Sequence, residues 1–284
     1  MCIRDRNTKS GARKNIVAHY DLGNEFYEAW LDETMTYSSA RFTQSEMSLA
    51  DAQINKYRLL AQTLDLKPGE RVLEIGCGWG GFAEYAAREI GASIVGVTIS
   101  PSQLEFAQQR IFQAGLNEKV ELRLQDYRDV TETFDKIVSI EMFEAVGREY
   151  WDVFFQKIHS TLRPGGKAGL QIITMADEFF ETYANSTDFI QRFVFPGGML
   201  ASPSVLRAHM ENANLTFVQN NQFGQDYART LNHWHTRFLE KWPEIEPLGF
   251  DARFKKLWRF YLSYCEAGFR AGTTNVGHVL AIRD

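Results

Sequence analysis

Short apolar runs and longer amphipathic stretches alternate through the central part of the chain. Arg71 to Ile75 is an apolar run typical of a buried strand, and glycines after it lead into a helical pattern that lasts to about Ile90. A second such run, Ser93 to Thr98, precedes a helix that Ser100 caps and that reaches Gly115. Further strands are expected at Val120 to Leu124, Lys136 to Ile140 and Lys167 to Thr174. This alternation predicts an α/β fold with a parallel, doubly wound sheet.

Helical patterns flank this core on both sides. Before it, apolar residues recur at helical spacing from Ala18 to Leu31, and Ser48 with Asp51 opens a helix that ends near Leu64. Beyond Met175 we expect a mostly helical stretch with a turn at 195–198, a helix from Ser204, a strand from Leu215 to Gln219, an aromatic-rich helical region from Tyr227 to Ala267, and a closing edge strand from Thr274 to Ile282. The expected division is a tail or truncation scar (1–17) and one domain (18–284), in which a helical cap (18–66) and lid helices (176–202 and 225–272) surround a core sheet (67–175, 203–224 and 274–284).

Composition narrows the class of protein. The chain has 284 residues, 44% of them apolar, and without linker-like tracts it is expected to fold as one cooperative unit. Its formal net charge of −5 argues against nucleic acid as a partner, because general nucleic-acid binding needs a basic surface. The widely spaced Cys2, Cys77 and Cys265 predict neither a disulfide framework nor a zinc site, and no apolar run is long enough for a membrane span. His233 and His235 face apart on a predicted helix, so no metal site is expected. These features indicate a reducing, cytoplasmic location.

A glycine turn, Gly76-Cys77-Gly78-Trp79-Gly80, follows the first predicted strand. Between a buried strand and a helix, such a turn lets a ligand approach the backbone, which indicates a nucleotide-like ligand. The spacing fits G-x-G-x-G, and Gly81 also completes the dinucleotide pattern G-x-G-x-x-G, so the pattern alone is ambiguous. The second strand ends without an acidic residue, so Thr98 or Gln103 would have to bind a ribose. No P-loop lysine follows, which disfavours phosphoryl transfer, and a turn used only for packing is the alternative.

Several motifs occur in order along nearly the whole chain, from about Val17 to Arg283. They are Ala18-His19-Tyr20-Asp21-Leu22-Gly23-Asn24, Met35-Thr36-Tyr37-Ser38, Val72 to Gly81, Gly96 to Ser100, Gln125 to Asp129, Met142-Phe143-Glu144-Ala145-Val146-Gly147, Phe195 to Gly198 and Phe269-Arg270. In this set the chain resembles the cyclopropane-fatty-acyl-phospholipid synthase family of class I S-adenosylmethionine-dependent methyltransferases. The resemblance implies a Rossmann-like, mostly parallel seven-stranded sheet with a helical N-terminal preamble and helical lid insertions. Longer members of the family carry an extra N-terminal domain.

The resemblance implies S-adenosylmethionine as the cofactor. Its pocket would be formed by Tyr37, Ser38, Glu74, Gly76, Cys77, Gly78, Trp79, Gly80, Thr98, Ser100, Gln103, Asp126 and Tyr127. The chemistry of these residues agrees with that ligand. The glycine turn would receive the methionine part, Gln103 can hydrogen-bond the ribose diol, and Asp126 can accept from the adenine amine. For Tyr127, ordinary packing is the alternative.

The resemblance also implies an activity. The family transfers a methyl group to the double bond of an unsaturated phospholipid acyl chain, and a cyclopropane or a methylene or methyl branch forms through a carbocation. Aromatic faces suit such a cation. In this family the base resembles a bound bicarbonate, whose holders here would be Glu144, the backbone of Ile173, and Tyr227.

Two positions depart from the family pattern. Ser39 stands where the family often has cysteine, and Gln171 stands where it has histidine; neither side chain titrates near neutral pH. With the stretch Ser139-Ile140-Glu141-Met142, Gln171 looks closer to a branch that makes methylene or methyl branches, so both kinds of product stay open. Cys265 occupies the place of a cysteine long designated as active in the family. A buried structural thiol is the alternative, because no neighbouring cation would lower its pKa.

The implied substrate places the protein at a membrane surface, peripheral at the inner face, with a homodimer left open. A basic cluster on one predicted helix would meet anionic headgroups, and a solvated helix face is the alternative. It consists of Arg253, Lys255, Lys256 and Arg259. Aromatic residues between Trp234 and Tyr264 would form helix core or an apolar wall for the substrate. Two other functions compete: N-methylation of a small amine on the same scaffold, and a catalytically silent module that binds the cofactor.

Overall fold

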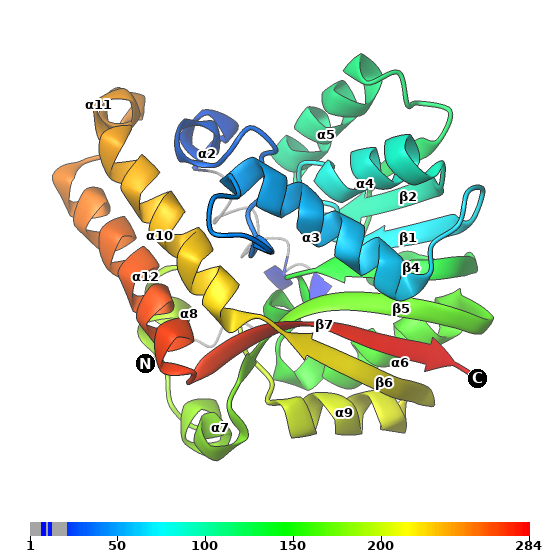
Figure 1. The fold of residues 1–284 in the computed structure, drawn as a ribbon. Coiled ribbons are helices and arrows are strands. Elements are labelled where there is room, and N and C mark those ends of the chain that lie inside the picture. The colour runs from blue at the N-terminus through cyan, green and yellow to red at the C-terminus, as the bar shows by residue number, and fades with distance from the viewer. Residues whose placement is uncertain (1–6, 10, 13–21) are drawn as a thin grey trace.

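A computed structural model describes residues 7–9, 11–12 and 22–284, and His19 with the start of its motif lies outside these residues. The strands are β1 (Arg71–Ile75), β2 (Ser93–Thr98), β3 (Val120–Leu124), β4 (Phe134–Ile140), β5 (Leu162–Met175), β6 (Leu215–Gln222) and β7 (Thr274–Arg283). They form a seven-stranded sheet in the order β3-β2-β1-β4-β5-β7-β6 (Figure 1). Strands β1 to β5 are parallel, and β7 is antiparallel to both of its neighbours. The predicted α/β class and its mostly parallel sheet are confirmed.

Helices cover both faces of this sheet. They are α2 (Asn24–Trp30), α3 (Leu49–Leu64), α4 (Gly81–Tyr85), α5 (Pro101–Gln113), α6 (Trp151–Thr161), α7 (Asp177–Ala184), α8 (Phe189–Phe193), α9 (Pro203–Asn212), α10 (Gly224–Glu240), α11 (Trp242–Ile245) and α12 (Ala252–Ala271). A π-helical turn (Ala86–Ile90) continues α4, and 3-10 turns lie at Tyr127–Asp129, Phe143–Ala145, Arg148–Tyr150 and Glu246–Leu248. One apolar core lies between the sheet and α6 and α9, and another lies under α3, α4 and α5.

Helix α3 begins and packs as its sequence dictates. The hydroxyl of Ser48 accepts a hydrogen bond from the backbone N–H of Asp51 at 3.1 Å, which confirms the predicted cap. Gly169 on β5 lies under this helix, where a Cβ atom would come within 2.8 Å of Leu64 and 3.1 Å of Leu60. The absence of a side chain there lets α3 lie directly against the sheet.

Strand β7 does not close an edge of the sheet, so the expectation of an edge strand at 274–282 is wrong. It lies between β5 and β6 and pairs with both. Val276 and Val279 are fully buried, and His278 between them is 3% exposed, because an inner strand is covered on both faces. The edges are β3 and β6.

The lid consists of α7, α8 and the group α10 to α12, and it faces the carboxyl ends of the parallel strands (Figure 1). Helices α10 and α12 pack on each other and on α2 through aromatic side chains. Trp30, Trp234 and Trp258 are buried at the centre of this cluster, whereas Tyr261 also lines the cavity described below. The aromatic-rich segment therefore supplies helix core and part of a cavity wall at once.

Candidate active site

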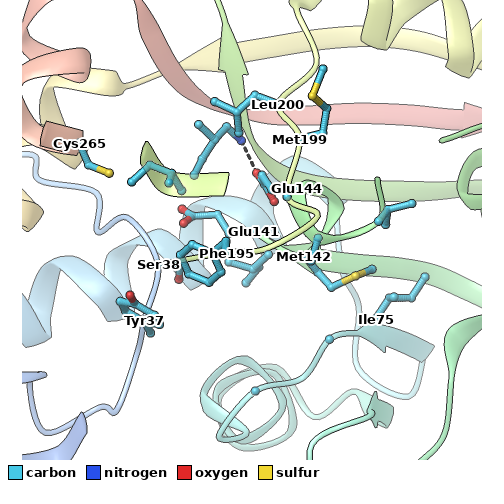
Figure 2. A pocket seen from close by; sticks show the side chains of 18 of the residues that line it. Tyr37, Ser38, Ile75, Glu141, Met142, Glu144, Phe195, Met199, Leu200 and Cys265 are labelled. Carbon is cyan, nitrogen blue, oxygen red and sulfur yellow. Dashed lines mark hydrogen bonds between the residues drawn. The ribbon is translucent and has the colours of Figure 1, made fainter. Parts of the chain in front are cut away.

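A cavity of about 590 Å³ lies between the carboxyl ends of the parallel strands and the lid. Its size is that of a typical small-molecule site. One end is polar and contains the glycine turn, Gln103 and Asp126, while the other end is apolar and contains Leu231, Phe269 and neighbouring lid residues. Figure 2 shows the middle of this cavity, where Glu141 and Glu144 lie between Tyr37 and Met199. Every predicted site residue lines it except Gly80, Ser100, Ser39 and Gln171.

The glycine turn exposes its backbone to the polar end. Gly76, Gly78 and Gly80 have φ angles of 80°, 52° and 82°, in the left-handed region that glycine adopts readily. A Cβ atom at Gly76 would lie 2.7 Å from Met142, whereas one at Gly78 would point into open space. The turn is anchored because the N–H groups of Gly76 and Cys77 donate to the carbonyl of Val97. A ligand can therefore approach the backbone most closely at Gly78.

Residues after β2 form a prepared hydrogen-bonding group. The Thr98 hydroxyl donates to Oε1 of Gln103 at 3.2 Å, which leaves the Gln103 amide nitrogen as the donor toward the cavity. Ser100 instead caps α5, and its hydroxyl accepts from the backbone N–H of Gln103. Ser100 thus helps to hold Gln103 in place at the start of α5.

Asp126 lies at the same end of the cavity, with its carboxylate bound to Arg128. Nε and Nη2 of Arg128 donate to Asp126 at 2.8 Å and 2.6 Å. Burial raises the pKa of Asp126, but these hydrogen bonds outweigh it and lower the pKa below its ordinary value. The carboxylate therefore stays an acceptor at neutral pH. Beside it, the ring of Tyr127 packs edge-on against Phe154 and also lines the cavity.

Part of the expected tail covers this polar end. Asn7 is 5% exposed and lines the cavity, and its amide donates to the carbonyl of Gly197 at 2.9 Å. The carbonyl of Asn7 accepts from Arg128. Asn7 and Ala12, which lie in the expected tail, therefore line the cavity together with residues of the domain.

Glu74 closes the polar end at the carboxyl end of β1. Its Oε2 atom is buried and has no hydrogen-bond partner in the described part of the chain. Burial raises the pKa of Glu74 to about 8, opposed by a backbone hydrogen bond from Ala83. Oε2 of Glu74 is thus an acceptor that the ammonium group of a methionine moiety could use, close to the open backbone at Gly78. The described residues therefore fit S-adenosylmethionine.

The loop before α3 forms the wall opposite the glycine turn. The hydroxyls of Tyr37 and Tyr261 are hydrogen-bonded at 2.8 Å, which ties this loop to the lid. Trp79 donates to Asn24 at 2.8 Å. Ser38 accepts from Lys56 at 2.7 Å, so a fully buried lysine lies directly behind the cavity wall.

A half-buried carboxylate, Glu141, occupies the centre of the site, and no site role was predicted for it from the sequence. It accepts hydrogen bonds from the backbone N–H of Ser39 at 2.8 Å, from Nε2 of Gln171 at 2.7 Å and from the hydroxyl of Tyr227 at 2.6 Å. Burial is the largest effect and raises the pKa of Glu141 above its ordinary value, and these three donors and Lys56 oppose that rise. Three donors that converge on one carboxylate favour its ionised form.

Glu144 lies beside it with a different proton state. Oε1 of Glu144 accepts the backbone N–H of Ile173 at 2.5 Å, and its buried Oε2 has no partner among the described residues. Burial and the charge of Glu141 raise the pKa of Glu144 to about 8. Glu144 accepts one hydrogen bond and Glu141 accepts three, so a single proton on the pair is favoured on Glu144.

Two further buried groups lie near Glu141, and neither was predicted from the sequence. His278 on β7 pairs with Gln171 across the sheet, and its Nε2 lies 2.9 Å from Oε1 of Gln171. Burial lowers the pKa of His278 to about 3, so the ring is neutral and donates to that oxygen. Burial lowers the pKa of Lys56 to about 7, although Glu141 and Asp32 raise it. Neither residue belongs to a motif, and only the tertiary fold brings them to the site.

The structure does not fit a bound bicarbonate. The backbone N–H of Ile173 and the hydroxyl of Tyr227, which the resemblance assigned to that ion, already donate to Glu144 and Glu141. The two departing positions, Ser39 and Gln171, also donate to Glu141. The carboxylates of this chain thus take up the donors that the resemblance assigned to the ion.

Cys265 lines the apolar end on α12. Burial, and then the charge of Asp188, raise the pKa of its thiol well above the ordinary value. The group is therefore a neutral thiol near pH 7, as expected for the structural alternative. The apolar wall around it is formed by Ile190, Phe195, Met199, Leu200, Leu231, Tyr261 and Phe269.

Three features define a class I S-adenosylmethionine-dependent methyltransferase. They are the sheet order, the antiparallel strand β7 and the open glycine turn after β1. The family model described as mycolic acid cyclopropane synthetase matches residues 7–279. The chain belongs to this cyclopropane synthase family, whose members named below modify lipid acyl chains.

Individual relatives agree with this assignment. Over 98% of its length the chain is 41% identical to the cyclopropane-fatty-acyl-phospholipid synthase of Escherichia coli (strain K12), of which it covers 70%. It is 39% identical to the tuberculostearic acid methyltransferase UfaA1 of Mycobacterium tuberculosis, of which it covers 67%. The solved structure of mycolic acid cyclopropane synthase CmaA1 complexed with SAH and CTAB matches 95% of this chain and 98% of that one, with a TM-score of 0.90 and 31% identity.

Proposed function

We propose that this protein transfers a methyl group from S-adenosylmethionine to the double bond of an unsaturated phospholipid acyl chain. The observation that carries this proposal is one cavity that joins a polar nucleoside end to an end lined mainly by apolar lid residues, with Glu141 and Glu144 between them. Bound S-adenosylmethionine would supply an electrophilic methyl group, which the π electrons of the alkene attack to leave a carbocation. An acyl chain suits the apolar end, because Leu231, Phe195 and Phe269 offer it no hydrogen bond.

Aromatic rings at the junction suit the charge that develops. Tyr227 stacks on Phe269 with ring centroids 4.4 Å apart, and both line the cavity. The hydroxyl of Tyr227 is held by Glu141, so its ring has a fixed position. Ring faces attract a cation that has no hydrogen-bonding group, and such attraction is worth about 0.5 to 2 kcal/mol per ring.

Two kinds of product follow from the same cation. Loss of a proton with closure of a new carbon–carbon bond gives a cyclopropane, and loss of a proton with formation of a double bond gives a methylene branch. The relatives are named for both chemistries, cyclopropane synthesis and tuberculostearic acid formation. Gln171 in place of histidine, beside Glu141, favours the branched product in this chain.

The lid offers a surface for the lipid bilayer. Phe193 on α8 and Phe260 on α12 are 53% and 52% exposed, and Tyr264, which is also exposed, lines the cavity. Phe189 joins them, with ring centroids 4.6 Å from Phe260 and 5.4 Å from Phe193. We call Phe189, Phe193, Phe260 and Tyr264 the lid aromatic patch. Its place beside the cavity would let an acyl chain enter from the membrane.

Basic residues continue this patch along α12. Arg253 and Lys256 are exposed and lie at helical spacing from Phe260, on the same face. Of the predicted basic cluster, Lys255 instead packs over Trp242 at 4.9 Å and is half-buried. No helix in the described part of the chain is long and apolar enough to cross a membrane. We therefore propose peripheral binding to an anionic membrane through these residues.

Vesicle binding tests this surface. The double variant Phe193→Ser, Phe260→Ser should lower cosedimentation with vesicles of phosphatidylglycerol by about tenfold or more, because two exposed apolar anchors are removed. Phe112→Ser, which changes a 71% exposed phenylalanine on α5, is the matched control and should bind as the wild type does. Equal loss in both variants would contradict the proposed surface.

Product analysis tests the activity. The purified protein is incubated with S-adenosylmethionine and a monounsaturated phosphatidylglycerol, and the released fatty-acid esters are analysed by mass spectrometry. The proposal predicts that the acyl chain gains one CH2. Transfer only to small amines would favour the competing N-methyltransferase, and cofactor binding without any transfer would favour the silent module. Hydrogenation then separates the products, since it saturates a methylene under conditions that leave a ring intact.

A further inference from the structure

Hydrogen bonds fix the carboxylate of Glu141 in an orientation that suits a catalytic base. Its three hydrogen-bond donors come from three separate parts of the chain: the loop at Ser39, strand β5 at Gln171 and helix α10 at Tyr227. Oε1 accepts two of these bonds, and Oε2 accepts only that of Tyr227. Oε2 therefore keeps a lone pair, and Glu141 lines the cavity where the acyl chain would lie.

The backbone of Glu141 also favours a functional role. Its φ angle is 49°, in the left-handed region that side chains other than glycine, asparagine and aspartate seldom adopt. Partial burial of its carboxylate adds a second unfavourable contribution to the folding free energy. Strain and buried charge together persist in proteins mainly at functional sites. A glycine at this position would relieve the strain and would free all three donors.

The groups around Glu141 favour its ionised form over that of Glu144, because three donors converge on Glu141. Glu144 accepts a single backbone hydrogen bond, and burial raises its pKa to about 8, which favours the proton of the carboxyl pair on this residue. Lys56 lies behind the wall and contributes an attractive charge to Glu141. His278 faces Gln171 as a neutral donor, so it orients the amide without competing for a proton.

We propose that Glu141 is the catalytic base of this enzyme, and that its carboxylate fills the anion site in which relatives would hold bicarbonate. This inference rests on the proposed lipid methylation and adds the residue that removes the proton. After methyl transfer, a C–H bond of the methylated cation breaks and its proton passes to Oε2 of Glu141. The electron pair of that bond forms either the third side of a ring or a carbon–carbon double bond. Glu141 then returns the proton to solvent, so one proton is released for each methyl group transferred.

His278 and Gln171 act as positioning residues in this arrangement. The imidazole donates to the oxygen of the Gln171 amide, and the nitrogen of that amide then faces Glu141. His278→Leu should therefore lower kcat by about tenfold and leave the KM for S-adenosylmethionine unchanged, because the Gln171 amide would lose the hydrogen bond that orients it toward Glu141. His278→Gln keeps a donor and should recover part of kcat, and equal loss in both variants would contradict the positioning role.

Removal of bicarbonate tests the base directly. In buffer freed of carbon dioxide, the wild type should retain its full rate of lipid methylation. Glu141→Gln keeps the shape of the side chain but cannot take a proton, and it should lose about a hundredfold or more in kcat. Glu141→Gly should be equally slow, and millimolar bicarbonate should restore its rate at least tenfold while leaving the wild type unchanged. A wild-type rate that falls without bicarbonate, or an unimpaired Glu141→Gln, would overturn the proposal.

A second readout does not depend on turnover. Carbon-13 NMR with labelled bicarbonate should detect binding to Glu141→Gly and none to the wild type. Calorimetry with S-adenosylhomocysteine should give the same affinity for both proteins and thus exclude misfolding of the variant. A Glu141→Gly protein that binds the cofactor product but ignores bicarbonate would contradict the shared anion site. If the wild type methylates no lipid at all, the proposed function fails before Glu141 is tested.

Discussion

Substitution of Gly78 tests the most open part of the glycine turn. Gly78 has a φ angle of 52° and lines the cavity, and a Cβ atom built there meets nothing within 4 Å. The new methyl group of Gly78→Ala would therefore cause no clash within the protein and would enter the space proposed for the cofactor. Gly165 is the matched control, since its φ angle is 73°, its Cβ direction is equally open, and it is not among the described residues that line the cavity.

The two variants should differ in one property only. Alanine in the left-handed region costs about 1 to 2 kcal/mol, and its stiffer unfolded chain returns about 0.4 to 1 kcal/mol, so each variant should lose about 1 kcal/mol of folding free energy. At Gly78 the methyl group should also weaken ligand binding by about 1 to 3 kcal/mol, the cost of overfilling a packed site. That range corresponds to about a five- to 150-fold loss of affinity.

Two measurements separate these effects. Urea unfolding should show the same loss of stability in Gly78→Ala and Gly165→Ala, and calorimetry with S-adenosylhomocysteine should show weaker binding only in Gly78→Ala. Wild-type affinity in Gly78→Ala would refute the placement of the cofactor against this turn. A loss of affinity in Gly165→Ala of the same size would show that backbone strain, and not contact, is responsible.

Further predictions concern the ionisable groups. The pKa of Glu74 is about 8 in the folded protein against an ordinary value of 4.5, so the folded state binds more protons and stability falls as pH rises between these values. In Glu74→Gln, the free energy of unfolding should therefore fall less steeply with rising pH, by about 1.4 kcal/mol per pH unit. Urea unfolding from pH 5 to 8 measures this slope, and an unchanged slope would contradict the burial of this proton. Tyr227→Phe removes a donor to Glu141 and should lower kcat by about tenfold or more without changing cofactor affinity, as steady-state kinetics and calorimetry can check. Because burial raises the pKa of Cys265, iodoacetamide should alkylate it far more slowly in the folded protein than in urea at pH 7.5, and mass spectrometry showing equal rates would indicate a thiolate.

Local patterns predicted the parts of the site that lie close together in the sequence. The glycine turn, Thr98 and Gln103 follow consecutive strands, and parallel pairing brings the carboxyl ends of β1 and β2 to one edge of the sheet. The strand alternation was sufficient to predict that edge. Ser100 shows the limit of local patterns, because its hydroxyl caps α5 and pairs with the hydroxyl of Ser102 and is not among the described atoms that line the cavity.

Long-range contacts explain what the sequence did not predict. Glu141 meets Ser39 and Tyr227 across 102 and 86 residues, and no local pattern encodes such separations. Gln171 was recognised as a substitution for histidine, but its neighbour His278 becomes visible only once β7 is known to pair with β5. The alternating pattern of β7 predicted an edge, whereas burial on both faces belongs to an inner strand.

Isotope transfer tests the central claim most directly. The protein is supplied with S-adenosylmethionine that carries a fully deuterated methyl group and with vesicles of a monounsaturated phosphatidylglycerol, and the fatty-acid esters are fragmented in a mass spectrometer. The account predicts one added carbon at the former double bond that retains two of its three deuterium atoms. Deuterium found only in amines, or absent from the acyl chain while the cofactor remains intact, would contradict it.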